Sequence, residues 1–132
     1  MGKTYIVSAI VMFVMALALS FLVHGVLLFG DYAVTPGMRP PAEADKLMSF
    51  MILAQAFFGV AFAWIYVQGK EDRPWLPQGF RFGIAIAFLT VIPTYLIYHV
   101  VTPVPLALAL KQIGFDTVRL VLMGVVLAWI NR

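Results

Sequence analysis

Four apolar stretches, each about 20 residues long or longer, constrain the fold of this chain more than any other feature. They run approximately over residues 5–29, 47–67, 82–101 and 106–130. A helix rises about 1.5 Å per residue, so about 20 apolar residues cross the roughly 30 Å hydrocarbon core of a bilayer. Only helices and closed barrels satisfy their backbone hydrogen bonds in lipid, and four such stretches cannot close a barrel. We therefore predict an all-α membrane protein, with residues 1–132 forming one transmembrane domain, a compact up-down bundle of four helices.

The composition points to the same class of protein. Hydrophobic residues make up 63% of the chain and charged residues 11%, against about 45–50% and about 25% in soluble domains. The chain has no cysteine, which excludes disulfides, thiolate metal sites and thiol redox chemistry. Its net charge is +3, and its lysines and arginines form no basic run that could follow a nucleic-acid backbone. We expect the lipid bilayer as its partner, with a homo-oligomer or a larger membrane complex as further candidates, and no nucleic acid, metal or cofactor.

The distribution of lysine and arginine predicts the orientation in the membrane. Cytoplasmic loops carry an excess of these residues. Two of them, Arg39 and Lys46, lie on one side of the predicted spans, whereas the side of the chain termini has Lys3, Lys70, Arg73, Arg81 and Arg132. We predict that both termini are cytoplasmic.

An internal duplication is suggested by the second and fourth stretches. Residues 59–66 (GVAFAWIY) and 124–131 (GVVLAWIN) are identical at five of eight positions, and residues 20–23 match 94–97 conservatively. We interpret the chain as two copies of one helical hairpin, the alternative being chance similarity among apolar helices. Small residues four positions apart allow helix backbones to approach closely, within one chain or in a dimer. Such pairs are Gly59 with Ala63, Gly124 with Ala128, and Gly79 with Gly83.

Two opposite charges interrupt the fourth stretch. Asp116 and Arg119 lie three residues apart at membrane depth, where an ionisable side chain costs about 2.5–3.5 kcal/mol on insertion scales. The equivalent positions of the second stretch are Met51 and Ala54, so the charges belong to one copy alone. They are either a structural ion pair or part of a functional site.

Most polar residues of the spans fall in the half of the membrane away from the termini. A channel or carrier requires a polar path from one face to the other, and here the path would stop halfway. Gln112, Asp116 and Arg119 share one face of a helix, since they are spaced i, i+4 and i+7. We predict a polar pocket that opens outward above an apolar floor and is lined by His24, Gln55, Tyr95, His99, Gln112, Asp116 and Arg119.

The two histidines have other interpretations. His24 and His99 fall at similar heights on two helices, and interfacial histidines commonly bond to backbone or water. Two such histidines can also ligate a haem, but haem requires both to face one deep cavity, and these are predicted near the surface.

Three segments resemble a known family. They are residues 21–28 together with Tyr32, residues 74–83, and residues 93–98 followed by Pro103 and Pro105. They resemble a family of small, uncharacterised bacterial four-helix inner-membrane proteins of unknown function. The resemblance implies a multi-pass protein of the bacterial cytoplasmic (inner) membrane and implies no activity.

The pattern favours a non-enzymatic integral membrane protein that binds a small ligand in its outward polar pocket or is an accessory subunit of a membrane complex. The sequence has no helical HExxH motif and no phosphate-binding glycine loop, and we predict no catalytic residue. One alternative is a small oligomeric transporter with Asp116 as its coupling carboxylate. Another is a membrane enzyme that acts on a lipid or quinone through His24 or His99 with Asp116.

Overall fold

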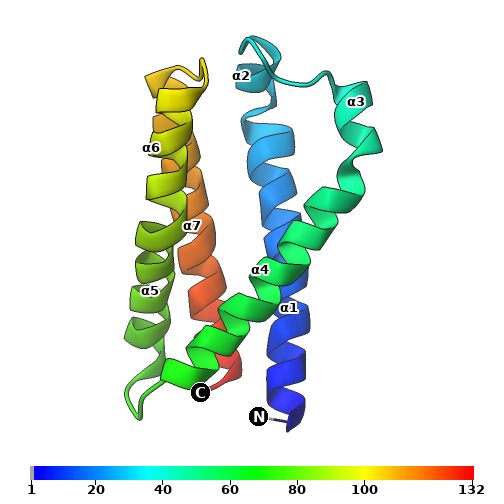
Figure 1. The fold of residues 1–132 in the computed structure, drawn as a ribbon. Helices are drawn as coiled ribbons and strands as arrows, with labels where there is room; N and C mark the ends of the chain where they lie inside the picture. The colour runs from blue at the N-terminus through cyan, green and yellow to red at the C-terminus, as the bar shows by residue number, and fades with distance from the viewer. Residues whose placement is uncertain (1) are drawn as a thin grey trace.

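The computed structural model of the chain describes residues 2–132 and consists of four long helical spans joined by loops (Figure 1). The spans cover Gly2–Leu27, Met48–Gly69, Trp75–Val101 and Leu106–Ile130, and each is long and apolar enough to cross a membrane. They run alternately up and down, so both ends of the chain lie at the same end of the molecule (Figure 1). We call this the terminal end and the opposite one the distal end.

Each span is helical throughout, and no strand occurs between residues 2 and 132. The first span comprises α1 (Gly2–Ser20) and the π-helical segment η1 (Phe21–Leu27), and the distal loop that follows contains the short helices α2 (Phe29–Ala33) and α3 (Pro41–Lys46). The second span is α4 (Met48–Gly69). The third comprises α5 (Trp75–Ile86), the π-helical segment η2 (Ala87–Val91) and α6 (Ile92–Val101), and the fourth is α7 (Leu106–Ile130).

The third span begins at Trp75, earlier than the predicted residue 82. Pro74 is its N-cap and Pro77 lies in its first turn, where a proline is tolerated because the missing N–H has no partner in the helix. Further along, Pro93 lies in the first turn of α6, directly after η2. A proline inside a helix removes one backbone bond and crowds a preceding carbonyl, and the wider π-helical turn is at this place.

Two helix pairs, α5 with α7 and α1 with α4, make the closest contacts. Glycines permit them: a Cβ on Gly124 would lie 2.4 Å from the Gly79 carbonyl oxygen, and a Cβ on Gly59 would lie 2.5 Å from the Phe13 nitrogen. The small residues predicted to allow close approach therefore serve packing within one chain. The core around these crossings is apolar and includes Met12, Ala16, Phe62, Leu120, Met123 and Leu127.

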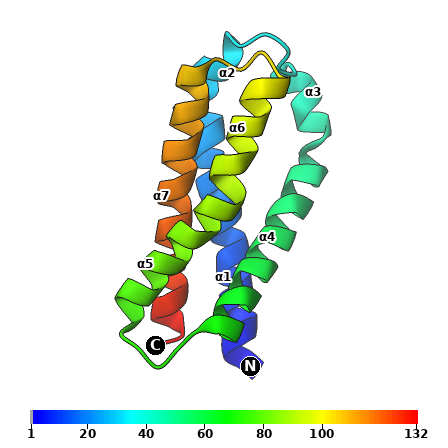
Figure 2. The same cartoon turned by 60° about the vertical axis from the view of Figure 1, so that its left-hand side comes forward.

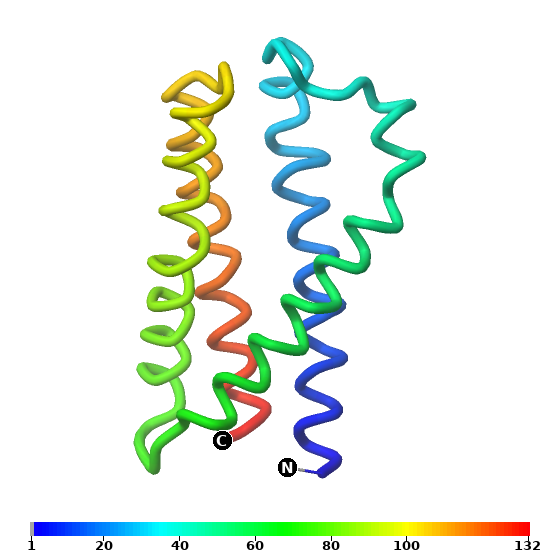
Figure 3. Tube along the Cα trace, in the orientation of Figure 1, coloured from blue at the N-terminus to red at the C-terminus, as the bar shows by residue number. Residues whose placement is uncertain are grey.

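The distal half of α4 departs from the compact bundle that we predicted. Residues 47–54 are all exposed, and this half of the helix leans away from α1 toward α3 (Figures 1 and 2). The trace in Figure 3 shows the same divergence along the backbone. Large side chains such as Phe50, Met51 and Leu53 occupy this half, without a glycine that would allow the close approach made at Gly59. The bundle is closed at the terminal end and splayed at the distal end.

Candidate functional site

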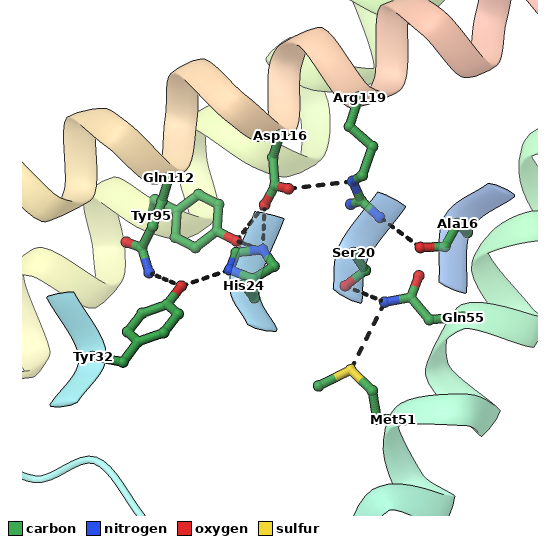
Figure 4. A network of polar contacts seen from close by, with 10 residues as sticks. All are labelled: Ala16, Ser20, His24, Tyr32, Met51, Gln55, Tyr95, Gln112, Asp116 and Arg119. Atoms are coloured by element: carbon green, nitrogen blue, oxygen red, sulfur yellow. Dashed lines mark hydrogen bonds and ion pairs between the residues drawn. The ribbon is translucent and has the colours of Figure 1, made fainter. Parts of the chain in front are cut away.

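Asp116 is the centre of a polar network in the distal half of the spans (Figure 4). It lies on α7 with its side chain 3% exposed. One oxygen, Oδ2, accepts hydrogen bonds from the Tyr95 hydroxyl on α6 and from His24 Nε2 on η1, the latter at 3.0 Å. The other oxygen, Oδ1, lies 3.2 Å from Arg119 Nε, one turn further along α7. The carboxylate thus joins three of the four spans.

The network continues from His24 toward the distal loop. His24 Nδ1 lies 2.6 Å from the hydroxyl of Tyr32 on α2, and Gln112 Nε2 donates to the same hydroxyl at 3.0 Å. An ionised carboxylate only accepts hydrogen bonds, so Nε2 of His24 carries a proton, and in the Nε2-protonated tautomer Nδ1 accepts from Tyr32. Every bond from Gln112 through Tyr32 and His24 then donates in the direction of Asp116.

Local backbone geometry positions these side chains. Gln112 and Asp116 are four residues apart on α7 and therefore face the same way. His24 lies in the π-helical segment η1, which closes with the bond from the Leu28 N–H to the Val23 carbonyl at 2.9 Å. A π-helical turn contains more residues than an α-helical turn and is common at functional sites. The short helix α2 then returns the chain so that Tyr32 reaches His24.

Arg119 neutralises Asp116 and connects the network to α1 and α4. Its Nη1 donates to the Ala16 carbonyl of α1 at 3.4 Å, and its guanidinium lies 5.6 Å from the centre of the Phe58 ring of α4. The contact between Nε and Asp116 Oδ1 has the length of an ion pair without the alignment of a hydrogen bond. Within residues 2–132, neither atom has a hydrogen-bond partner.

Tyr32 remains a protonated donor at neutral pH. Burial raises the pKa of its phenol above the ordinary value of 10.0, and the nearby charges of Asp116 and Asp31 raise this pKa further, whereas the hydrogen bond from Gln112 lowers it. Asp31 is also paired with Lys111, whose Nζ lies 3.1 Å from Oδ1 of Asp31. The distal ends of α2 and α7 are therefore joined by an ion pair and by the tyrosine.

The structure unites five of the predicted pocket residues: His24, Tyr95, Gln112, Asp116 and Arg119. Gln55 lies beside them on α4, where its Nε2 donates to the Ser20 hydroxyl of α1 at 3.2 Å. His99 lies apart from the network, because its Nδ1 donates to the Val104 carbonyl at 2.6 Å and so holds the turn between α6 and α7. Two hollows of the structure lie at the terminal end, and none of the seven predicted pocket residues lines them.

The sequence analysis missed Tyr32 and Ser20 as members of this region. Tyr32 follows the end of the first span by a few residues, outside the stretches in which polar pocket residues were sought. Its return to His24 depends on the helix α2, which no periodic pattern predicts. Ser20 is one turn before His24 on the same span, and that spacing was the available signal.

The donor set does not form a metal centre. No group of three or more histidine, aspartate or glutamate side chains in residues 2–132 could hold a metal ion. Both ring nitrogens of His24 are hydrogen-bonded within the network, and Nδ1 of His99 bonds to backbone. A haem held by these two histidines would have to displace those bonds.

The fold and composition define the chain as an all-helical membrane protein with four spans. Comparisons with known protein families, with curated proteins and with solved structures found no match.

Proposed function

We propose that this chain is a non-enzymatic integral membrane protein that binds a small amphiphilic ligand through an oxygen acceptor of the ligand. The ligand lies against Arg119 and Gln55, on the side of the bundle where the distal half of α4 leaves α1. The network around Asp116 holds Arg119 in place from the other side.

Unused hydrogen-bond donors on Arg119 carry this proposal. A guanidinium has five N–H groups, yet the one hydrogen bond that Arg119 makes within residues 2–132 is the long contact of 3.4 Å to the Ala16 carbonyl. Its side chain is 11% exposed, and its Nε atom is fully buried. A charged donor that is removed from water without acceptors is costly. A carboxylate, phosphate or carbonyl oxygen of a ligand would satisfy it.

Gln55 supplies a second polar group at the same place. Its Nε2 donates to Ser20, whereas its side-chain oxygen has no hydrogen-bond partner among the residues that the structure describes. Figure 4 shows Gln55 and Arg119 pointing toward the same stretch of α1, around Ala16 and Ser20. Residues 47–54, in the distal half of the second span, are all exposed, so we expect this stretch to be accessible from the membrane.

The transporter and the enzyme receive less support. Asp116 is buried, and its charge is compensated by Arg119 and by two hydrogen-bond donors, whereas a coupling carboxylate must exchange its proton with a path across the membrane. The core between the network and the terminal end is apolar, with Met12, Leu120 and Leu127 fully buried. For catalysis, His24 has no ring nitrogen free to act as a base.

An accessory subunit is the second candidate. The observation that favours it is the exposed distal half of α4, where Phe50 is 68% and Leu53 is 54% exposed. A neighbouring subunit could cover this surface as well as lipid does. If a larger complex co-purifies from native membranes while no small molecule is bound, this second proposal replaces the first.

Extraction of the purified full chain tests ligand binding. We expect mass spectrometry of solvent extracts to find one amphiphile enriched with the wild-type protein and lost from Arg119→Gln. Lys111→Gln is the matched control, because it removes a cation of the same helix that is paired with Asp31. Gln55→Leu leaves the ion pair intact and should lower the ligand content with the fold preserved. Equal content in all four proteins would refute the proposal.

The location and history of the chain are also part of the proposal. We place it in the bacterial cytoplasmic membrane with the terminal end inside, since most of the cations flank that end. A reporter that is active only in the cytoplasm should be active when it is fused to either terminus. The duplication of a hairpin is supported by Gly59 and Gly124, which each meet the first helix of their own hairpin.

A further inference from the structure

A hollow is lined by residues from the end of α4, the start of α5 and the loop that joins them. These segments lie at the terminal end of the molecule (Figure 1). The cationic part of its lining consists of Lys70, Arg73 and Arg81. The apolar part includes Ile65, Phe82 and Ala85. The network around Asp116 is at the opposite end of the molecule, so this hollow is separate from the proposed ligand site.

The positive charge of this hollow exceeds its negative charge. Three cations line it against one anion, Glu71. Arg73 Nε lies 2.6 Å from Glu71 Oε2, and both side chains are more than half exposed. Lys70 Nζ donates to the Asn131 carbonyl at 3.0 Å, which leaves two of its three donors. Arg81 is exposed and has no hydrogen bond or ion pair among residues 2–132.

The apolar part of the lining is continuous with the membrane-spanning surface. Ile65 belongs to the second span, and Phe82 and Ala85 belong to the third. Ile65 is 43% exposed on the surface of its span. Arg81 and Phe82 are neighbours on α5 and Ala85 lies one turn deeper, so a ligand that fills the hollow meets cations and apolar side chains close together.

We propose that this hollow binds an anionic phospholipid, with its phosphate at Arg81 and Arg73 and an acyl chain along Ile65 and Phe82. Guanidinium groups donate two parallel hydrogen bonds to phosphate oxygens, and basic pockets between spans bind the headgroups of anionic lipids. The apolar residues favour a lipid over free phosphate, because free phosphate has no hydrocarbon that could contact them. Phosphatidylglycerol carries the net negative charge that phosphatidylcholine lacks.

Native mass spectrometry of the full chain, stripped of lipid in detergent, tests this site. Phosphatidylglycerol and phosphatidylcholine with identical acyl chains are titrated separately. We expect phosphatidylglycerol to bind more tightly. Arg81→Gln should weaken its binding about fivefold, the loss of one cation near an anionic headgroup. Arg81→Lys should retain more of the affinity than Arg81→Gln.

Arg39→Gln is the matched control, since it removes one exposed cation from the distal loop. Equal binding of the two lipids would mean that the charge of the headgroup does not contribute, and would overturn the site. Equal loss of affinity in Arg39→Gln and Arg81→Gln would mean that the attraction is not confined to the hollow, and would overturn it as well. Displacement of phosphatidylglycerol by millimolar inorganic phosphate would assign the hollow to free phosphate instead. None of these results bears on the ligand proposed at Arg119.

Discussion

Gly124→Ala is the sharpest test of the helix crossing that forms the bundle. The added Cβ would lie 2.4 Å from the Gly79 carbonyl oxygen and 3.0 Å from the Gly83 nitrogen. Ordinary contact begins at 3.4 Å, so α5 and α7 would have to separate by about 1.0 Å (3.4 minus 2.4). The opposing atoms are backbone and cannot rotate away as a side chain can.

The expected loss follows from two opposing effects. Overpacking a well-packed site costs about 1–3 kcal/mol. Because the added Cβ would clash with backbone atoms, which cannot move aside, we take the upper end of this range, about 3 kcal/mol. Replacing glycine by alanine inside a helix returns about 1 kcal/mol. We therefore expect Gly124→Ala to lower the free energy of unfolding by about 2 kcal/mol.

Gly114→Ala is the control. Gly114 lies on the same helix as Gly124, and a Cβ added there would have no neighbouring atom within 4 Å. It should keep or raise the stability by up to about 1 kcal/mol. Reversible unfolding in mixed micelles titrated with dodecyl sulfate, followed by circular dichroism, measures both. If Gly124→Ala is as stable as Gly114→Ala, the two helices do not cross at these glycines.

Three further predictions concern the network. Arg119→Gln leaves Asp116 buried without its cation and should lower the free energy of unfolding by about 3–5 kcal/mol. The double variant with Asp116→Asn should lose less than the sum of the two single variants. Additive losses in the same unfolding assay would contradict the contact between the two residues. Tyr32→Phe should cost about 1–3 kcal/mol, because the buried Gln112 and the partly buried His24 lose their shared partner. Because the pKa of Tyr32 is raised in the folded state, its contribution to stability is complete below pH 10 and is lost as the pH rises toward the folded-state pKa. The free energy of unfolding, measured from pH 8 to 11, should therefore decline less in Tyr32→Phe than in the wild type. An equal decline would contradict the burial of this phenol. Nitrogen NMR of labelled histidine should find the Nε2-protonated neutral form of His24, and an Nδ1-protonated ring would reverse the direction of the bonds.

The spans could be predicted from the sequence because apolar length is a local property. The fourth was predicted as residues 106–130, the bounds of α7 in the structure. The third was predicted to begin too late, because Pro74 and Pro77 were interpreted as loop residues although both occupy the N-terminal turn. The splayed half of α4 was not predicted, since hydrophobicity alone does not distinguish a side chain that faces lipid from one that faces another helix.

The site was predictable where it depends on one helix. The shared face of Gln112, Asp116 and Arg119 follows from their spacing. Whether a histidine on another span reaches that face depends on how its helix is rotated, and His24 and His99 looked equivalent by height. The π-helical segment turns His24 toward Asp116, whereas His99 ends its helix against the Val104 carbonyl.

The π-helical segment η1 makes the spacing of the first span sensitive to insertions and deletions. A π-helical turn is an α-helical turn that holds an extra residue, so removing one residue between Phe21 and Leu27 leaves a continuous α-helix of nearly the same hydrophobic length. The span would still insert, and the helix on either side of the deletion would keep its register, whereas the side chains inside η1, His24 among them, would point in new directions. A variant of this kind would keep its topology and the glycine crossings while His24 loses Asp116. Chain length in η1 therefore controls the network without changing a single polar residue.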